Sequence, residues 1–388
     1  MSPHDHPAER PLREVALVFG HLGVVAFGGP AAHIALMREE LVRRRGWVDD
    51  RRFVDLMGAT NLLPGPNSTE LALHLGHERA GWRGLLLAGV CFILPAALMV
   101  TALSWAYVEH GQAPAVTGLL YGVVPVVVAI IAWSVVGMAP TVLRSRWLVL
   151  LAVAGLAAYL AGVNELVVLF GGAGVAAVVR AARSLYERRA RGERLGALGL
   201  PVLLASAVLG EANGAQLTQL FWTMLKIGSL LYGGGYVLLA FLEGDFVDRL
   251  GWITQQQLLD GISLGQVTPG PLFTTATFVG YLVAGLPGAL VATVAIFLPS
   301  FVLVGLLTRL AGWLRSRTWT SALLDGVNAT GLALIVGVCG ELAANALVDP
   351  LTLALAALTL LVLWRTRWSS TWLILAGAAV GIAHALAT

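Results

Sequence analysis

The sequence carries little charge and almost no lysine. Of its 388 residues, 12% are charged and 57% are hydrophobic, and the mean hydropathy is +0.80. Soluble domains have about 25% charged residues, so this chain has too little polar surface to remain in water. Lys226 is its single lysine, and the net charge of +3 comes from clustered arginines. This excludes the solvated basic face that nucleic-acid binding needs. The composition therefore predicts a protein embedded in a lipid bilayer.

Several chemical signatures are also missing. The two cysteines, Cys91 and Cys339, lie in apolar stretches without metal-ligand spacing, so we expect no metal and no other cofactor. The sequence has neither a Gly-x4-Gly-Lys-Ser/Thr phosphate loop nor a His-Glu-x-x-His zinc motif. Their absence argues against ATP-driven transport and against an enzyme. Residues 1–14 are polar, and we expect no signal peptide.

An internal duplication runs through the chain. Gly46-Trp47 recurs as Gly251-Trp252 at a spacing of 205 residues, and Pro95 recurs as Pro299 at a spacing of 204. Secondary transporters are commonly built from such internal repeats. We predict a first repeat over 1–181, a basic linker with an inverting transmembrane helix over 182–212, and a second repeat over 213–388.

Two breaks interrupt apolar stretches in each half. They are Gly28-Gly29-Pro30 and Pro64-Gly65-Pro66 in the first half, and Gly233-Gly234-Gly235 and Pro269-Gly270-Pro271 in the second. Proline removes a backbone donor and clashes with the preceding helical turn. Within a bilayer, such a break survives only where it is buried in protein or lines a wet cavity. The breaks predict either packing kinks or broken, re-entrant helices, and their repetition favours the second alternative.

A helix that restarts after a break presents unpaired backbone N–H groups, and these attract anions. Hydroxyls, amides and cation-capable side chains cluster near the breaks and could hydrogen-bond the oxygens of an oxyanion. The candidate substrate-binding residues are His21, Gly28, Gly29, Asn61, Pro64, Gly65, Pro66, Asn67, Ser68, Thr69, Lys226, Gly233, Gly234, Gly235, Gln266, Thr268, Pro269, Gly270, Pro271, Thr274 and Thr275.

These candidates have alternative interpretations. The hydroxyls can serve only as helix caps, and Asn67 with Glu70 has the spacing of a capping box. Lys226 matches His21 across the repeat, and either side chain can extend to the membrane surface or pair with a carboxylate. Glu70 and His33 are ionisable residues in apolar surroundings, so they are candidates for proton coupling.

The arginines predict how the halves are oriented, because cytoplasmic loops collect basic residues. If the basic clusters of the first half face the cytoplasm, residues 12–45 and 52–79 must each enter the bilayer and return. An additional span near 196–210 then inverts the second half. We predict an all-α polytopic membrane protein with two homologous halves in inverted orientation and about 10 to 13 membrane segments. The N-terminus would be cytoplasmic and the C-terminus periplasmic.

The motifs resemble those of the chromate ion transporter family in its long, two-domain form. Phe27-Gly28-Gly29-Pro30, Gly46-Trp47, Asn61-Leu62-Leu63-Pro64-Gly65-Pro66 and Pro95 resemble the first domain of that family, and Tyr232-Gly233-Gly234-Gly235, Gly251-Trp252 and Gln266-Val267-Thr268-Pro269-Gly270-Pro271 resemble the second. The resemblance covers nearly the whole chain. It implies a bacterial inner-membrane protein that exports chromate and confers chromate resistance. It also implies dependence on the proton-motive force, with sulfate as a competing analogue.

Two other classes of function remain open. One is an anion channel, which would pass the ion down its own gradient. The other is an intramembrane enzyme assembled from His33, His74, His77 and Glu70, but no part of the repeat supports that arrangement. The expected partners are chromate or a related oxyanion, protons and the bilayer, with a homodimer as a further possibility.

Overall fold

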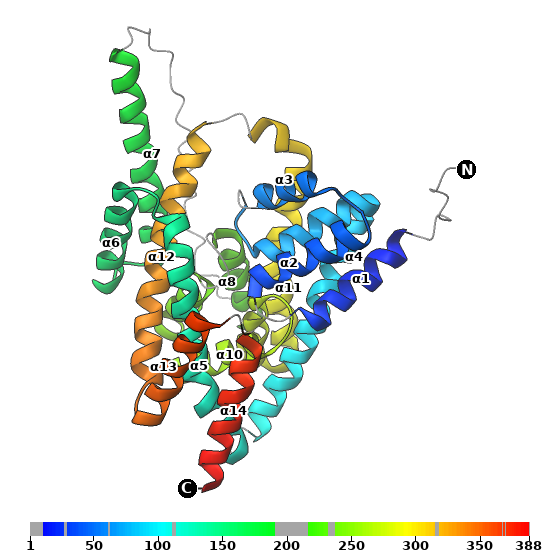
Figure 1. Ribbon diagram of the computed structural model, residues 1–388, viewed down its shortest axis with the longest axis vertical. Coiled ribbons are helices and arrows are strands. Elements are labelled where there is room, and N and C mark those ends of the chain that lie inside the picture. The colour runs from blue at the N-terminus through cyan, green and yellow to red at the C-terminus, as the bar shows by residue number, and fades with distance from the viewer. Residues whose placement is uncertain are drawn as a thin grey trace.

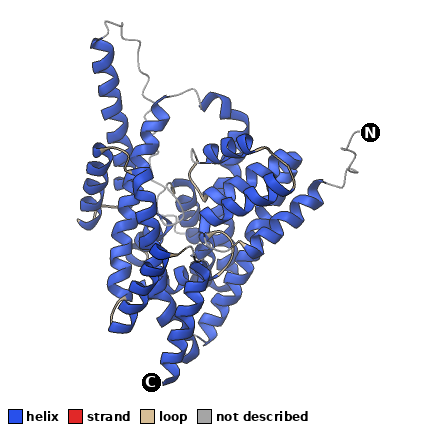
Figure 2. Ribbon diagram, in the orientation of Figure 1, coloured by secondary structure: helices blue, strands red, loops and turns tan. Residues whose placement is uncertain are grey.

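The computed structural model is helical throughout the part of the chain that it describes, and Figure 2 shows no strand there. The described residues are 11–26, 29–60, 63–110, 114–190, 216–231, 237–314, 318–366, 368 and 370–387. The helix predicted near 196–210 lies outside them. Among the described residues, six helices are long and apolar enough to cross a membrane, which supports a multi-pass membrane protein.

Every helix of the first half has a counterpart in the same order in the second, which also contains a short 3-10 helix, η3 (Figure 1). The first half has α1 (Pro11–Val25), α2 (Gly29–Met37), η1 (Arg38–Arg44), α3 (Asp50–Thr60), α4 (Asn67–His110), α5 (Pro114–Val142), α6 (Arg146–Leu160) and α7 (Glu165–Ala190). The second has α8 (Gln216–Leu230), α9 (Val237–Leu242), η2 (Glu243–Arg249), α10 (Gln255–Val267), η3 (Leu272–Thr274), α11 (Thr275–Leu314), α12 (Thr318–Ala346), α13 (Pro350–Arg365) and α14 (Ser370–Ala387). The predicted duplication is therefore also visible in the structure.

The backbone repeats the duplication in detail. The segments η1 and η2 are both seven-residue π-helices. Helix α4 turns sharply at Ala80 (φ −145°, ψ 24°) and Gly81 (φ 62°, ψ −149°). Helix α11 makes the same turn at Ala284 (φ −147°, ψ 30°) and Gly285 (φ 60°, ψ −149°). Only glycine readily adopts such a positive φ, so these two glycines set the direction of the long helices that follow.

The predicted helix breaks are present at both Pro-Gly-Pro turns. Helix α3 ends at Thr60 and α4 begins at Asn67, and in the second half α10 ends at Val267 before η3 and α11. The part of α4 before its sharp turn spans residues 67–79. At 1.5 Å per residue it is about 20 Å long, whereas the hydrocarbon core of a bilayer is about 30 Å thick. The segment 67–79 is therefore too short to cross the bilayer. The turn that precedes it lies inside the protein, where Gly65 and Pro66 are buried.

The halves interlock through small residues. Helix α7 packs on α12, and its repeat counterpart α14 packs on α5. A Cβ atom on Gly122 would come 2.0 Å from the carbonyl oxygen of Gly377, and one on Gly326 would come 2.7 Å from that of Gly172. Such close backbone approach is typical of helix packing within membranes. Each half thus completes its bundle with a helix from the other half.

A stripe of exposed leucine and valine follows the outer face of α4. Leu86, Val90, Leu94 and Leu98 are each about half exposed and are spaced four residues apart. The corresponding residues of α11, such as Leu290 and Val294, are exposed in the same way. Residues four apart lie on one face of a helix, so each long helix presents a continuous apolar face suited to lipid chains.

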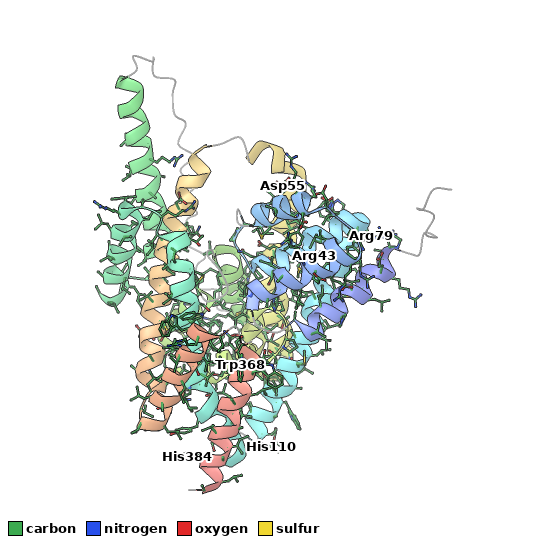
Figure 3. All side chains as sticks on the ribbon, viewed as in Figure 1. Arg43, Asp55, Arg79, His110, Trp368 and His384 are labelled. Carbon is green, nitrogen blue, oxygen red and sulfur yellow. The ribbon has the colours of Figure 1, made fainter. Side chains whose placement is uncertain are left out.

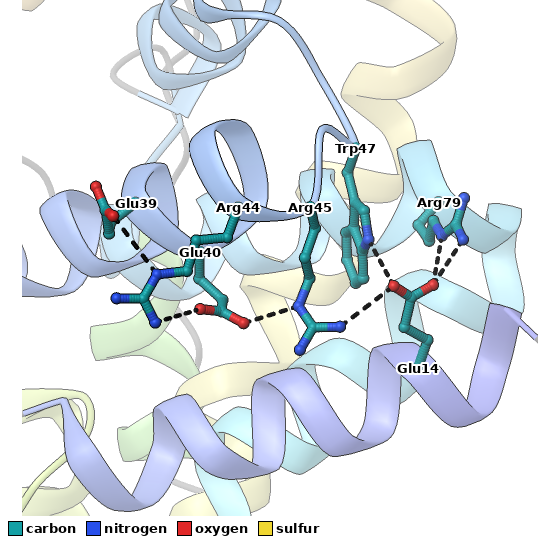
Figure 4. A network of polar contacts seen from close by, with 7 residues as sticks. All are labelled: Glu14, Glu39, Glu40, Arg44, Arg45, Trp47 and Arg79. Carbon is teal, nitrogen blue, oxygen red and sulfur yellow. Dashed lines mark hydrogen bonds and ion pairs between the residues drawn. The ribbon is translucent and has the colours of Figure 1, made fainter. Parts of the chain in front are cut away.

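A network of ion pairs holds the charged end of the first half together. The carboxylate of Glu14 on α1 accepts hydrogen bonds from Arg45, Trp47 and Arg79 (Figure 4). Burial alone would raise the pKa of Glu14, but the bonds from Arg79, Trp47 and Arg45 hold that pKa below its ordinary value. The network ties the start of α1 to η1 and to the sharp turn of α4. Figure 3 shows Arg43 and Arg79 on the right of the molecule, well above His110 and His384, which lie towards its lower end.

Candidate functional site

The two Pro-Gly-Pro turns meet the opposite half of the chain at equivalent places. The N–H of Gly65 donates to the carbonyl oxygen of Leu231 at 2.7 Å, and the N–H of Gly270 donates to that of Ala26 at 2.9 Å. Ala26 and Leu231 directly follow α1 and α8 and are 205 residues apart, as are Gly65 and Gly270. The turn of each half therefore contacts the broken helix of the other. We call these two contacts the crossing.

Both turns require glycine. Gly65 has φ 140° and Gly270 has φ 99°, values that side chains of L-residues rarely permit. A Cβ atom on Gly65 would lie 2.4 Å from the Oε1 of Glu70 and 2.5 Å from the Oγ of Ser300. A Cβ atom on Gly270 would lie 2.5 Å from the Cβ of Ala96. The crossing therefore leaves no room for a larger side chain at either glycine.

The crossing is chemically asymmetric. Glu70 is fully buried in the first turn of α4, and the hydroxyl of Ser300 on α11 lies 3.5 Å from its Oε1. The corresponding residues on the Gly270 side are Thr275 and Ala96, which carry no charge. Glu70 therefore contacts the other half of the chain through Ser300. Ser300 is not among the site residues predicted from the sequence, although it directly follows Pro299, the repeat partner of Pro95.

Four buried polar atoms near the turns have no hydrogen-bond partner within the described part of the chain. They are Thr69 Oγ1, Glu70 Oε2, His74 Nε2 and Gln266 Nε2. Buried polar atoms in proteins are nearly always paired with protein, water or ligand. The first three belong to the first two turns of α4, and Gln266 lies at the end of α10. One of them is the amide donor that the sequence predicts at Gln266, and all four could bond a ligand because none is paired among the described residues.

His33 links the start of α2 to the crossing. Its Nε2 lies 2.9 Å from the carbonyl oxygen of Ala26, and its Nδ1 lies 3.2 Å from the Oγ of Ser68. The Ala26 oxygen also accepts the N–H of Gly270. A neutral imidazole that donates from Nε2 and accepts at Nδ1 satisfies both contacts. In this structure His33 holds three chain segments together at the crossing.

The hydroxyls of the second turn are engaged with the backbone. Thr268, Thr274 and Thr275 donate to the carbonyl oxygens of Gly265, Pro271 and Leu272. Their oxygen atoms can still accept hydrogen bonds, but their protons are already used. These bonds run from each hydroxyl to the carbonyl oxygen three residues earlier, so they are not N-caps, in which the hydroxyl oxygen would accept a backbone N–H.

The two matched cationic positions are not at the crossing. Lys226 Nζ lies 2.7 Å from Oδ1 of Asp245 on η2, and Arg249 shares that carboxylate. His21 is exposed on α1. The pairing of Lys226 with a carboxylate is one of the alternatives given by the sequence. Asn61, Gly28 and Gly233–Gly235 lie outside the described residues, and Gly29 begins α2.

Paired helix breaks buried between two interlocked, repeated halves define a membrane transporter of the internal-repeat class. The chain belongs to the chromate transporter family, whose pattern matches residues 13–178 and again residues 218–382. The two matches begin 205 residues apart, like the repeat, and together they confirm the family that the motifs resemble. Membership in this family supports a chromate transport function.

Three relatives illustrate this membership. The chain is 33% identical to a chromate transport protein of Cupriavidus metallidurans over 95% of this chain and 92% of the relative. It is 33% identical to a chromate transport protein of Pseudomonas aeruginosa over 94% and 90%, respectively. It is 30% identical to a probable chromate transport protein of Synechococcus elongatus over 93% and 92%. No solved structure matches the chain.

Proposed function

We propose that the protein is a secondary transporter that exports chromate across the bacterial inner membrane, with sulfate as a competing substrate. The observation that carries this proposal is the crossing, where two broken helices from opposite halves meet beside unpartnered buried polar atoms. Chromate is a tetrahedral dianion with acceptor oxygens. The start of α4 at Asn67 offers backbone N–H groups, and Gln266 offers an amide donor.

We infer that the halves, residues 1–181 and 213–388 joined by the linker 182–212, are inverted relative to each other. In Figure 1 the later part of α4 runs down towards the end of the molecule where α14 ends, whereas α11 runs upwards towards the start of α12. Helices α5 and α12 are likewise drawn in opposite directions. Opposite chain directions in corresponding helices are what an inverted repeat requires.

The arginine-rich end supports a cytoplasmic N-terminus. Glu14, near the start of α1, pairs with Arg45 and Arg79 at that end. His384, near the C-terminus, lies towards the lower end of the molecule, away from Arg43 and Arg79 (Figure 3). With basic residues inside, the C-terminus is periplasmic. The substrate would then pass from the arginine-rich side, through the crossing, to the side of His110 and His384.

The driving force we propose is the proton-motive force. Moving one charge through 100 mV is worth about 2.3 kcal/mol, so a dianion that leaves a negative interior gains about 4.6 kcal/mol per 100 mV. The pH gradient adds to this only if a group in the protein binds a proton during the cycle. Glu70 and His33 are our candidates at the crossing. Glu70 is the stronger candidate because its Oε2 has no partner.

Everted membrane vesicles test this proposal. We expect energised vesicles that contain the protein to accumulate chromate, sulfate to compete, and a protonophore to abolish accumulation. Vesicles without the protein are the control. Accumulation no greater than in that control would sink the proposal. Flux that follows the chromate gradient and ignores the protonophore would instead identify an anion channel.

The Lys226–Asp245 pair makes a separate prediction. Lys226→Ala should destabilise the protein by about 3 kcal/mol, because it removes a partner from a carboxylate that is nearly buried. The double variant Lys226→Met/Asp245→Asn should recover most of that stability, because neither side chain is left charged. Thermal unfolding in detergent measures both changes. A double variant that unfolds as early as the single variant contradicts the pairing.

Transport by the double variant assigns the role of Lys226. If Lys226 serves only to hold Asp245, transport returns together with stability. If Lys226 contacts the oxyanion during the cycle, the double variant is stable but inactive. Arg249→Gln, which removes only the exposed second partner of Asp245, is the matched control.

A further inference from the structure

The contact between each π-helix and the helix that follows it is preserved across the repeat, but its chemistry changes. In the first half, Arg38 on η1 pairs with Asp50 at the start of α3 at 2.7 Å. The corresponding residues in the second half are Glu243 on η2 and Gln255 at the start of α10, and the amide of Gln255 donates to the carboxylate of Glu243. An exposed ion pair has therefore become a buried carboxyl group beside a neutral amide.

Glu243 is almost completely buried. Only 3% of its surface is exposed, and its Oε2 has no hydrogen-bond partner. The carboxyl group of Glu341 on α12 interacts with that of Glu243 and raises its pKa. Two carboxylates cannot hydrogen-bond to each other, whereas a carboxyl and a carboxylate that share one proton can. A shared proton would satisfy the Oε2 atom that the protein leaves unpaired.

Neighbouring residues bond to this carboxyl pair and pack closely around it. Tyr159 on α6 donates to Oε2 of Glu341 at 3.3 Å. Its ring fits against Gly337, where a Cβ atom would come 2.4 Å from the ring. A Cβ atom on Gly244 would come 2.1 Å from a carboxylate oxygen of Glu165 on α7. Glycines on α12 and η2 therefore make room for the groups that surround Glu243.

No cation neutralises the pair among the described residues. The nearby bases, Lys226 and Arg249, both pair with Asp245. The other charged neighbours are Glu165 and Asp248, which add negative charge. No group of three or more His, Cys, Asp or Glu in the described part of the chain has the geometry to hold a metal ion. A proton is therefore the remaining group that can neutralise the negative charge of the Glu243–Glu341 pair.

We propose that Glu243 and Glu341 form a proton-binding carboxyl pair that releases and takes up one proton during the transport cycle. The inference rests on the proposed function and extends it, because the pair lies apart from Glu70 and the crossing. Burial, followed by the hydrogen bond and charge of Glu341, raises the pKa of Glu243 to about 8, although the bond from Gln255 lowers it. A group with that pKa holds its proton at neutral pH and can lose it during turnover.

Helix α9 lies between the Glu243–Glu341 pair and the crossing along the chain. Glu243 directly follows α9, whose six residues span about 9 Å. On the other side of the break, Leu231 accepts the N–H of Gly65. Loss of the proton would leave two buried carboxylates that repel each other, and η2 would move away from α12. Movement of η2 would be transmitted to α9, which directly precedes it.

Infrared spectroscopy of the purified full-length protein tests proton binding without transport. We expect a carboxyl C=O band at neutral pH that shifts in D₂O and disappears as the pH rises through about 8, falling tenfold in protonated population per pH unit beyond that. Glu243→Gln and Glu341→Gln should each remove the band. Asp248→Asn, an exposed acid on the same π-helix, should keep it. A wild-type spectrum with no band ionising near that pH overturns the proposal.

A second measurement separates proton coupling from a purely structural role. In proteoliposomes, Glu243→Gln should keep chromate counterflow, which needs no net proton movement, but lose the acceleration by a pH gradient. A variant that keeps the full acceleration contradicts the proposal. If wild-type protein shows the titrating band but transports no chromate, the proposed function fails while the proton site stands.

Discussion

Alanine at Gly270 is expected to reduce chromate transport to background and to lower the stability of the protein. The backbone at Gly270 has φ 99°, and holding an alanine there costs about 1–3 kcal/mol. The new methyl group would also lie 2.5 Å from the Cβ of Ala96, within the kinked helix α4. Either the turn or α4 must shift, and the hydrogen bond from Gly270 to Ala26 would be lost. Gly65→Ala should act in the same way against Glu70 and Ser300.

Two control variants separate the causes of this effect. Gly285→Ala has a similar positive φ of 60° but no atom within 4 Å of the new methyl group, so it measures backbone strain alone. Gly20→Ala lies within α1 and also has open space around it, so it should be neutral. Both stability in thermal unfolding and transport in vesicles should be highest for Gly20→Ala, lower for Gly285→Ala and lowest for Gly270→Ala. Equal activity of Gly270→Ala and Gly20→Ala would show that the crossing does not matter.

Glu70→Gln is expected to change how chromate affinity depends on pH. An ionised Glu70 beside a bound dianion would repel it by several kcal/mol at an effective dielectric constant of about 20. Chromate should therefore bind wild-type protein more weakly as the pH rises and Glu70 loses its proton. Glutamine has the same shape but no charge, so the variant should bind chromate with an affinity that hardly changes with pH.

Binding of chromate to purified protein across a pH series measures this difference. Ser300→Ala is the matched control, because it removes the hydroxyl beside Glu70 but leaves the carboxyl group able to ionise. It should keep the pH dependence of the wild-type protein. If the Glu70→Gln protein shows the same pH dependence as the wild type, Glu70 does not face the substrate. The variant also contrasts with Glu243→Gln, which should leave binding unchanged and alter coupling instead.

Local sequence patterns are sufficient for much of the architecture. The spacing of 205 residues predicts corresponding helices, and the proline and glycine positions predict where α3, α4, α10 and α11 begin or end. These features depend on backbone sterics and on the length of apolar runs, which are properties of neighbouring residues. The burial of Glu243, by contrast, has no counterpart in the local sequence pattern, because the segment Glu243–Arg249 is rich in charged residues. The structure has a π-helix there with Glu243 and Asp245 buried, where Gln255 of α10 pairs with Glu243 and Lys226 of α8 pairs with Asp245.

The sequence by itself determined that the protein lies in a membrane, that it is duplicated, that its helices break at glycine and proline, and which family it resembles. Only the tertiary structure decided that each Pro-Gly-Pro turn bonds to the broken helix of the other half, that Glu70 meets Ser300, and that Lys226 meets Asp245. The physical reason is that composition and helix breaks act over a few residues, whereas these contacts join residues far apart in the chain. Their positions depend on how the two interlocked halves pack.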